Sequence, residues 1–280
     1  MRQYRLGDFG PLLWRFVQWG GVDWADNFEK TLEEKLAAID TAQNKATSYY
    51  VFNASGIGFS SLDNFNCYAQ LADLHFDLVV QYVGINDARL NNCPYDVFKN
   101  NYTHIAWNNE INSVLRHPEI NLFTTLFFID YSCQLLKEQL FKNRFIPVHY
   151  SMNKNWWNYG NEFKSLPCFK QNITHIANLC RKKKEKLLLM SYAYYIPMNY
   201  SLASFKHKNL DYIFQKKSRE IEIWGSPKNV SAYLDSSNII MHQIAITMGE
   251  SYFDMNLEIG STHTYFADIC HFSYQGLSKF

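Results

Sequence analysis

The stretch from Asp77 to Arg89, DLVVQYVGINDAR, decides the fold predicted for this chain. Its apolar part, 78–83, predicts a buried strand. Polar residues follow at the point where the strand ends. In an open α/β sheet, ligands bind beyond the carboxyl ends of the strands, so Asn86 is a candidate donor of a side-chain amide to a developing oxyanion. The alternative is an ordinary turn, in which Asn86 and Asp87 hydrogen-bond to their own backbone.

Helical and extended patterns alternate on both sides of this stretch. Apolar residues at helical spacing predict helices, and short apolar runs between turn signals predict strands. The alternation predicts parallel strands joined by helices. The predicted strands are Leu13–Trp19, Tyr49–Asn53, Lys186–Met190 and Ser251–Asp254, and the predicted helices are Asn27–Ile39, Leu62–Leu74, Asn172–Lys182 and Ser236–Met248.

Length and charge limit the classes of partner. A chain of 280 residues can form one large α/β domain. It carries 27 Lys and Arg against 26 Asp and Glu, so its charge does not favour nucleic acid as a partner. No apolar run is long enough to cross a bilayer. The oligomeric state is left open.

The six cysteines form no CxxC or Cys/His ligand pattern, so no metal site is expected. Their spread is typical of reduced thiols in a cytosolic protein. No basic leader followed by an apolar run opens the sequence. These features favour a cytoplasmic location.

An aromatic-rich segment, about residues 94–167, interrupts the α/β pattern. Aromatic residues make up 17% of the chain, and many lie in this segment. The rings can fill the core or shape an access channel to a site. The segment is predicted to be mostly helical between Asn109 and Leu140, and to be an insertion in a single domain spanning 1–280.

A second candidate site closes the chain, in the run Phe266–Gly276, FADICHFSYQG. Asp268 lies three residues before His271. A carboxylate at this spacing can orient one imidazole nitrogen while the other faces a reacting group, as a general base requires. The alternative is a surface aspartate and a core histidine that are close only in sequence.

These motifs, in this order, resemble those of the SGNH (GDSL-type) hydrolase family. The order is Asn53–Gly58 (NASGIG) after one strand, Gly84–Asp87 (GIND) after the next, and Asp268–His271 (DICH) near the end. The resemblance runs from about Val22 to the carboxyl terminus but does not cover the segment between Cys93 and Cys168. It implies a three-layer α/β/α sandwich, flavodoxin-like, with a mainly parallel sheet.

The resemblance also implies hydrolysis of ester bonds. In that family a serine attacks an acyl carbonyl, and the matching residues here give His271 as the base and Asp268 as its orienting carboxylate. Asn86 and the backbone amide of Gly58 would stabilise the oxyanion. The implied substrate is an acyl ester of a carbohydrate or lipid, or another small molecule, and no cofactor is implied.

The chain departs from the family pattern at the nucleophile. The first serine is Ser48, so none precedes the first predicted helix. The missing motif aligns either with Gly7–Phe9 or with Gly20–Val22, and we prefer the second because it follows a better strand. Three serines near Gly58 are conceivable substitutes, although their backbone belongs to the oxyanion loop in the family: Ser55, Ser60 and Ser61.

Three hypotheses follow from the sequence. The first is an SGNH-type ester hydrolase, and the second is a catalytically inactive member of that family that binds a ligand or partner. The third is an unrelated flavodoxin-like binding domain, in which the motifs are coincidental turns. The first two hypotheses require Asn86, Gly58 and His271 to lie close together, whereas the third does not. The positions of these three residues therefore distinguish the third hypothesis from the first two.

Overall fold

The computed structural model describes residues 25–42, 49–56, 58–103, 154–215, 218–260 and 262–279, and single positions between 125 and 140. The predicted strand Leu13–Trp19 lies outside the described residues, as do both alignments of the missing nucleophile motif. Most of the predicted helix Asn109–Leu140 also lies outside them. Six described positions within it are helical: Thr125, Ile129, Ser132, Cys133, Leu136 and Leu140.

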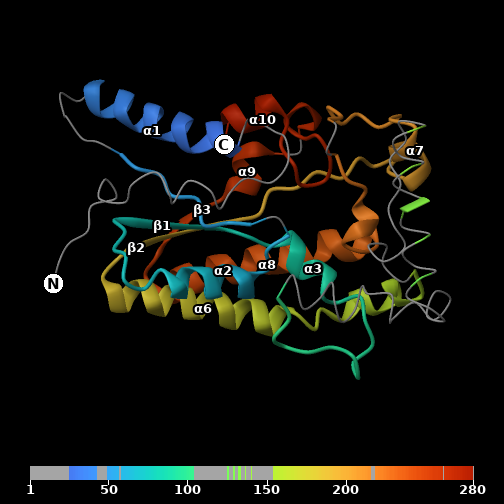
Figure 1. The fold of residues 1–280 in the computed structure, drawn as a ribbon, viewed down its shortest axis with the longest axis horizontal. Helices are drawn as coiled ribbons and strands as arrows, with labels where there is room; N and C mark the ends of the chain where they lie inside the picture. Colours follow the sequence, from blue (N-terminus) through green and yellow to red (C-terminus); the bar gives the residue numbers. More distant parts are fainter. Residues whose placement is uncertain are drawn as a thin grey trace.

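The described part of the chain is a mixed α/β structure around a three-stranded parallel sheet (Figure 1). The strands are β1 (Leu78–Tyr82), β2 (Lys186–Met190) and β3 (Ser251–Phe253), in the order β1-β2-β3. Both pairs are parallel, as predicted. Tyr82 is level with Met190, and Met190 with Phe253, so the three carboxyl ends lie at one edge.

Helices α2 (Ser61–Gln70), α6 (Leu166–Lys183) and α8 (Pro227–Met248) lie on one side of the sheet (Figure 1). The apolar side of α6 is fully buried and packs with sheet residues such as Leu187 and Leu189. This side was predicted from the helical spacing of its residues. Its members are Ile173, Ile176, Ala177 and Cys180.

Helices α1 (Ala25–Ala42), α9 (Met255–Ile259) and α10 (Tyr274–Lys279) lie on the other side of the strands in Figure 1. The remaining elements are short: α3 (Ile85–Arg89), α7 (Leu202–Lys206) and the 3₁₀ segments η5 (Lys154–Glu162), η6 (Ile221–Ile223) and η7 (His263–Tyr265). None of the described helices has the length and apolar character required to span a membrane.

Helix boundaries differ from the predicted ones where capping residues set them. Helix α8 begins at Pro227 instead of Ser236, because the Ser226 side chain accepts a hydrogen bond from the backbone N–H of Asn229. Proline fits the first turn, where its missing N–H has no helical partner. Helix α2 begins within a capping box made by Ser60 and Asp63, and ends at Gln70, short of the predicted Leu74.

The predicted strand Tyr49–Asn53 is wrong. These residues are described, but they form no strand. The backbone N–H of Val51 donates to Glu33 Oε1 at 2.6 Å, and the Tyr49 hydroxyl donates to Asp40 Oδ2 at 2.7 Å. Aromatic and β-branched residues favour an extended backbone and predict a strand. In the structure, however, side chains of α1, and not a neighbouring strand, accept the hydrogen bonds of this segment.

A buried carboxylate ties the elements together at the opposite edge of the sheet. Glu185, just before β2, has a fully buried side chain. It accepts hydrogen bonds from the Tyr68 hydroxyl of α2 and from the backbone N–H of Phe76, and pairs with Lys183 Nζ at 2.8 Å. Such a carboxylate is stable in the interior only because each partner is present.

Candidate functional site

Helix α3 begins directly after β1 and places the GIND residues at the carboxyl edge of the sheet. A Cβ at Gly84 would lie 3.2 Å from Tyr192 Cβ and 3.3 Å from Leu234 Cδ2, so the close packing of β1 against its neighbours favours glycine. Asp87 is buried and accepts hydrogen bonds from the N–H of Ser61 at 2.9 Å and from its hydroxyl at 2.6 Å. Asp87 thereby fixes the start of α2 against α3.

The Asn86 side chain contacts two other segments. Its Nδ2 donates to the carbonyl oxygen of Phe59 at 3.0 Å, and its Oδ1 accepts from Trp224 Nε1 at 3.1 Å. Because Phe59 follows Gly58, the structure brings Asn86 and the Gly58 loop together. Gly58 has φ 78°, in the left-handed region that glycine adopts at little cost.

Asp268 and His271 lie within hydrogen-bond distance. His271 Nδ1 is 2.7 Å from Asp268 Oδ2 and 2.9 Å from Oδ1. The carboxylate is fully buried and also accepts backbone N–H groups from Arg219, Cys270 and His271. The carboxylate is therefore held rigidly, and it orients a ring whose side chain is 49% exposed.

The surroundings of His271 raise its pKa well above the ordinary value of 6.5, through the Cys270 sulfur first and the Asp268 carboxylate next. Burial opposes this shift but does not cancel it. Burial also raises the pKa of the Cys270 thiol, so Asp268 supplies the lasting negative charge. A buried, hydrogen-bonded carboxylate beside an imidazole stabilises the imidazolium that forms when the ring accepts a proton.

Cys270 does not have the position of a nucleophile. Its Sγ lies 3.7 Å from Nδ1, the same nitrogen that contacts Asp268. A nucleophile has to face the other nitrogen, Nε2. The three side chains Asp268, Cys270 and His271 also place potential metal-ligand atoms within 4.8 Å of one another. Hydrogen bonds to both Asp268 oxygens, however, orient that carboxylate toward the backbone and the ring.

Trp224 links the two predicted parts of the site. Its indole N–H holds Asn86, and its ring centroid lies 6.3 Å from that of His271. Its carbonyl oxygen accepts a hydrogen bond from Asn92 Nδ2 at 2.8 Å, and this hydrogen bond fixes the turn before α8. Sequence reasoning missed Trp224. The available signal was a tryptophan followed by Gly225, just before a capping serine at a helix start.

The three serines considered as substitute nucleophiles are all engaged elsewhere. The Ser55 hydroxyl donates to Asn53 Oδ1, Ser60 to Asp63 Oδ2, and Ser61 to Asp87 Oδ1, each at 2.6 Å. Among the described residues, no serine, threonine or cysteine hydrogen-bonds to His271 Nε2. The part of the chain that is described therefore holds a histidine oriented by a carboxylate, but no hydroxyl or thiol that is hydrogen-bonded to its Nε2.

Comparison of the chain with protein-family models, curated proteins and solved structures found no match. Any functional conclusion consequently depends on the residues of this site and their geometry.

Proposed function

We propose that this chain is an SGNH-type hydrolase that acts on ester bonds, built as a three-layer α/β/α sandwich with a mainly parallel sheet. One observation carries the proposal: Trp224 hydrogen-bonds to Asn86 and its ring lies beside that of His271, which Asp268 orients. Separate turns with unrelated roles would have no reason to share one contact residue. This proximity also argues against the third hypothesis, of coincidental motifs.

In the proposed reaction, His271 Nε2 removes a proton from the attacking oxygen as that oxygen adds to the acyl carbonyl. Asp268 stabilises the resulting imidazolium through Nδ1. The Asn86 amide and the Gly58 backbone N–H stabilise the charge that develops on the carbonyl oxygen. The imidazolium then returns its proton to the departing alkoxide, which leaves as the alcohol.

The attacking oxygen belongs to a serine in the family pattern, and a covalent acyl-enzyme then forms. No serine precedes Ser48 in this chain. Water activated by His271 is the simplest replacement, and it would convert the ester to acid and alcohol in one addition and one elimination. Without a covalent route, the expected rate enhancement is modest and comes from the base and the oxyanion donors.

A second candidate is a catalytically inactive family member that binds an ester or a glycan. The observation that favours it is the lack, among the described residues, of any hydroxyl or thiol bonded to His271 Nε2. In that case the base and oxyanion donors remain as part of a binding surface.

Hydrolysis of p-nitrophenyl acetate by the purified chain, by His271→Ala and by Val22→Ser tests both candidates. The proposal predicts hydrolysis by the parent that is lost in His271→Ala. No hydrolysis by the parent, with a gain in Val22→Ser, would support an inactive family scaffold that has lost its nucleophile. No hydrolysis by any of the three would contradict the hydrolase proposal.

A further inference from the structure

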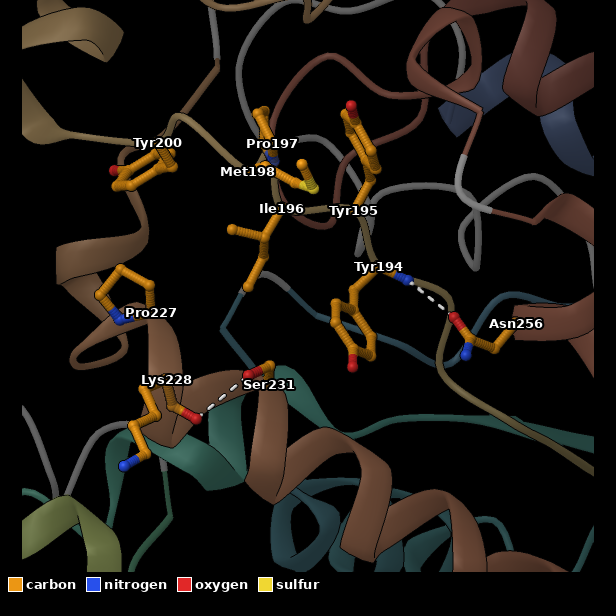
Figure 2. A pocket seen from close by; sticks show the side chains of 10 residues that line it. All are labelled: Tyr194, Tyr195, Ile196, Pro197, Met198, Tyr200, Pro227, Lys228, Ser231 and Asn256. Carbon is orange, nitrogen blue, oxygen red and sulfur yellow. Dashed lines mark hydrogen bonds between the residues drawn. The ribbon is translucent and has the colours of Figure 1, made fainter.

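A pocket of about 600 Å³ lies beside the candidate site, between the segment that follows β2 and the first turns of α8 (Figure 2). Tyr194, Ile196 and Tyr200 line it from the first segment, and Pro227, Lys228 and Ser231 line it from α8. None of the residues predicted from the sequence as catalytic lines this pocket. The pocket is therefore formed by residues other than those that carry the proposed chemistry.

The pocket adjoins the candidate site through shared packing. Tyr194, Ile196 and Tyr200 pack against the buried cluster that contains Trp224 and Cys270. The backbone N–H of Tyr195 also donates to the carbonyl oxygen of Ile269 at 2.9 Å, two residues before His271. A molecule in the pocket would therefore lie next to the segment that carries the base.

Two tyrosine rings in the pocket wall are fixed by carboxylates. The Tyr194 hydroxyl donates to Asp235 at 2.7 Å, and the Tyr200 hydroxyl donates to Glu222 at 2.5 Å. In Figure 2 the Tyr194 ring points from its segment toward Ser231 on α8. Rings held by their hydroxyl groups offer apolar faces at little entropic cost, and the side chains of Ser231 and Asn256 add polar groups to the same lining.

This lining discriminates between classes of ligand. The carboxylates of Asp235 and Glu222 do not line the pocket, but they lie directly behind the hydroxyls of Tyr194 and Tyr200, and their negative charge disfavours an anionic ligand. The hydroxyl of Ser231 makes the α8 wall polar, which is a poor match for an acyl chain, whereas the ammonium of Lys228 points away from the other lining residues in Figure 2. A neutral ring with one apolar face and several hydroxyl groups fits both kinds of wall.

We propose that this pocket binds a neutral glycosyl residue, with one sugar face against the tyrosine rings and its hydroxyl groups directed to the polar wall. The inference rests on the proposed function in one respect: the sugar would be the alcohol portion of the ester presented to His271. It narrows the proposed substrate class from a carbohydrate or lipid ester to a carbohydrate ester.

Binding, measured independently of hydrolysis, tests the inference. The fluorescently labelled parent chain is applied to an array of neutral oligosaccharides of glucose, galactose, mannose and N-acetylglucosamine, beside the same oligosaccharides carrying uronic or sialic acids. Dodecylphosphocholine micelles, assayed by fluorescence anisotropy, represent an apolar ligand. We expect retention on neutral oligosaccharides, and titration calorimetry with the best of them then gives the Kd.

Variants locate the binding in the pocket. Ser231→Phe fills the pocket and is expected to raise the Kd at least tenfold, which corresponds to about 1.4 kcal/mol. Lys228→Ala is compared with Lys170→Ala, an exposed lysine of α6 that does not line the pocket, and only Lys228→Ala should weaken binding. Melting temperatures confirm that each variant is folded.

His271→Ala separates this inference from the proposed function. Unchanged glycan binding by His271→Ala is expected, because His271 does not line the pocket. Binding without ester hydrolysis by the parent would uphold the pocket and contradict the hydrolase. Hydrolysis without retention on any neutral oligosaccharide would contradict the pocket alone. Preference for acidic glycans or micelles, or equal binding by a folded Ser231→Phe, would also overturn the inference.

Discussion

His271 is oriented through one ring nitrogen and half exposed, so its protonation state decides whether it can act as a base. Cys270 and then Asp268 raise its pKa above 6.5. A raised pKa means that protonated His271 stabilises the folded state below pH 6.5, and that this contribution is lost as the pH rises through the folded-state pKa. The neutral base needed for ester chemistry is therefore favoured on the alkaline side.

Asp268→Asn is expected to lower the pKa of His271 toward 6.5, because it removes the negative charge at Nδ1. Titration of the imidazole signals by NMR measures this pKa directly, with the remaining histidines of the chain as internal controls. Equal His271 pKa values in the parent and in Asp268→Asn would contradict the assigned role of Asp268.

Trp224 is expected to position the Asn86 side chain through a single hydrogen bond. Trp224→Phe keeps an aromatic ring beside His271 but removes the N–H that holds Asn86 Oδ1. The lost hydrogen bond should lower the free energy of unfolding by about 1 kcal/mol, as measured by urea denaturation. The hydrolysis rate should also fall, because the Asn86 amide is then held only by its hydrogen bond to the carbonyl oxygen of Phe59.

Trp157→Phe is the matched control for Trp224→Phe. The Trp157 indole nitrogen is buried but has no hydrogen-bond partner among the described residues. This variant should therefore lose no hydrogen bond and keep the hydrolysis rate of the parent. Equal effects of the two variants on rate would argue that Trp224 contributes only packing.

At the scale of elements, the sequence predicted the helices and strands whose apolar residues pack in the core. It failed for the segment 49–53, whose conformation depends on a contact with another element. Strand β2 has the predicted bounds, and α6 buries the predicted side. The 49–53 segment has strand-forming residues, but Glu33 of α1 takes the N–H of Val51. Local propensity could not reveal this partner, because it comes from another element.

Glu185 joins α2, β2 and the end of α6, so its loss should affect the whole fold. Glu185→Ala leaves the nearby Lys183 without its buried partner and should lower the free energy of unfolding by about 3 kcal/mol. Glu258→Ala, which removes an exposed ion pair with Lys279, should lower the free energy of unfolding far less, because solvent screens that pair. Urea denaturation of both variants measures the difference. Similar losses would contradict the structural role of Glu185.

Asp87 joins α2 to α3, and burial raises its pKa from 3.8 to about 7 while the Ser61 hydrogen bonds oppose the shift. Between these values the folded state binds more protons than the unfolded state, so the free energy of unfolding should fall as the pH rises. Asp87→Asn should remove this contribution to the pH dependence of the free energy of unfolding. Urea denaturation across this pH interval checks it, and parallel profiles in parent and variant would contradict it.

At the scale of the whole molecule, the order of short motifs predicted which distant segments meet. Asn86 and the Gly58 loop are in contact, and Trp224 connects them to His271. Of the three motifs only Gly84–Asp87 follows a strand of the sheet, β1, so its place at the carboxyl edge was the one that sequence order could predict. Trp224 could not be predicted this way, because its role depends on how a turn before α8 packs against two other segments. Both alignments of the missing nucleophile motif, Gly7–Phe9 and Gly20–Val22, fall outside the described residues.

The pH dependence of p-nitrophenyl acetate hydrolysis tests the central claim, that His271 is the general base of an ester-cleaving site. The rate should rise with pH and show an inflection at the His271 pKa measured by NMR in the same protein. The inflection should move to lower pH in Asp268→Asn. Hydrolysis should be lost in His271→Ala, whereas His263→Ala should keep the pH profile of the parent. A rate without an inflection at that pKa, or an unchanged rate in His271→Ala, would contradict the claim.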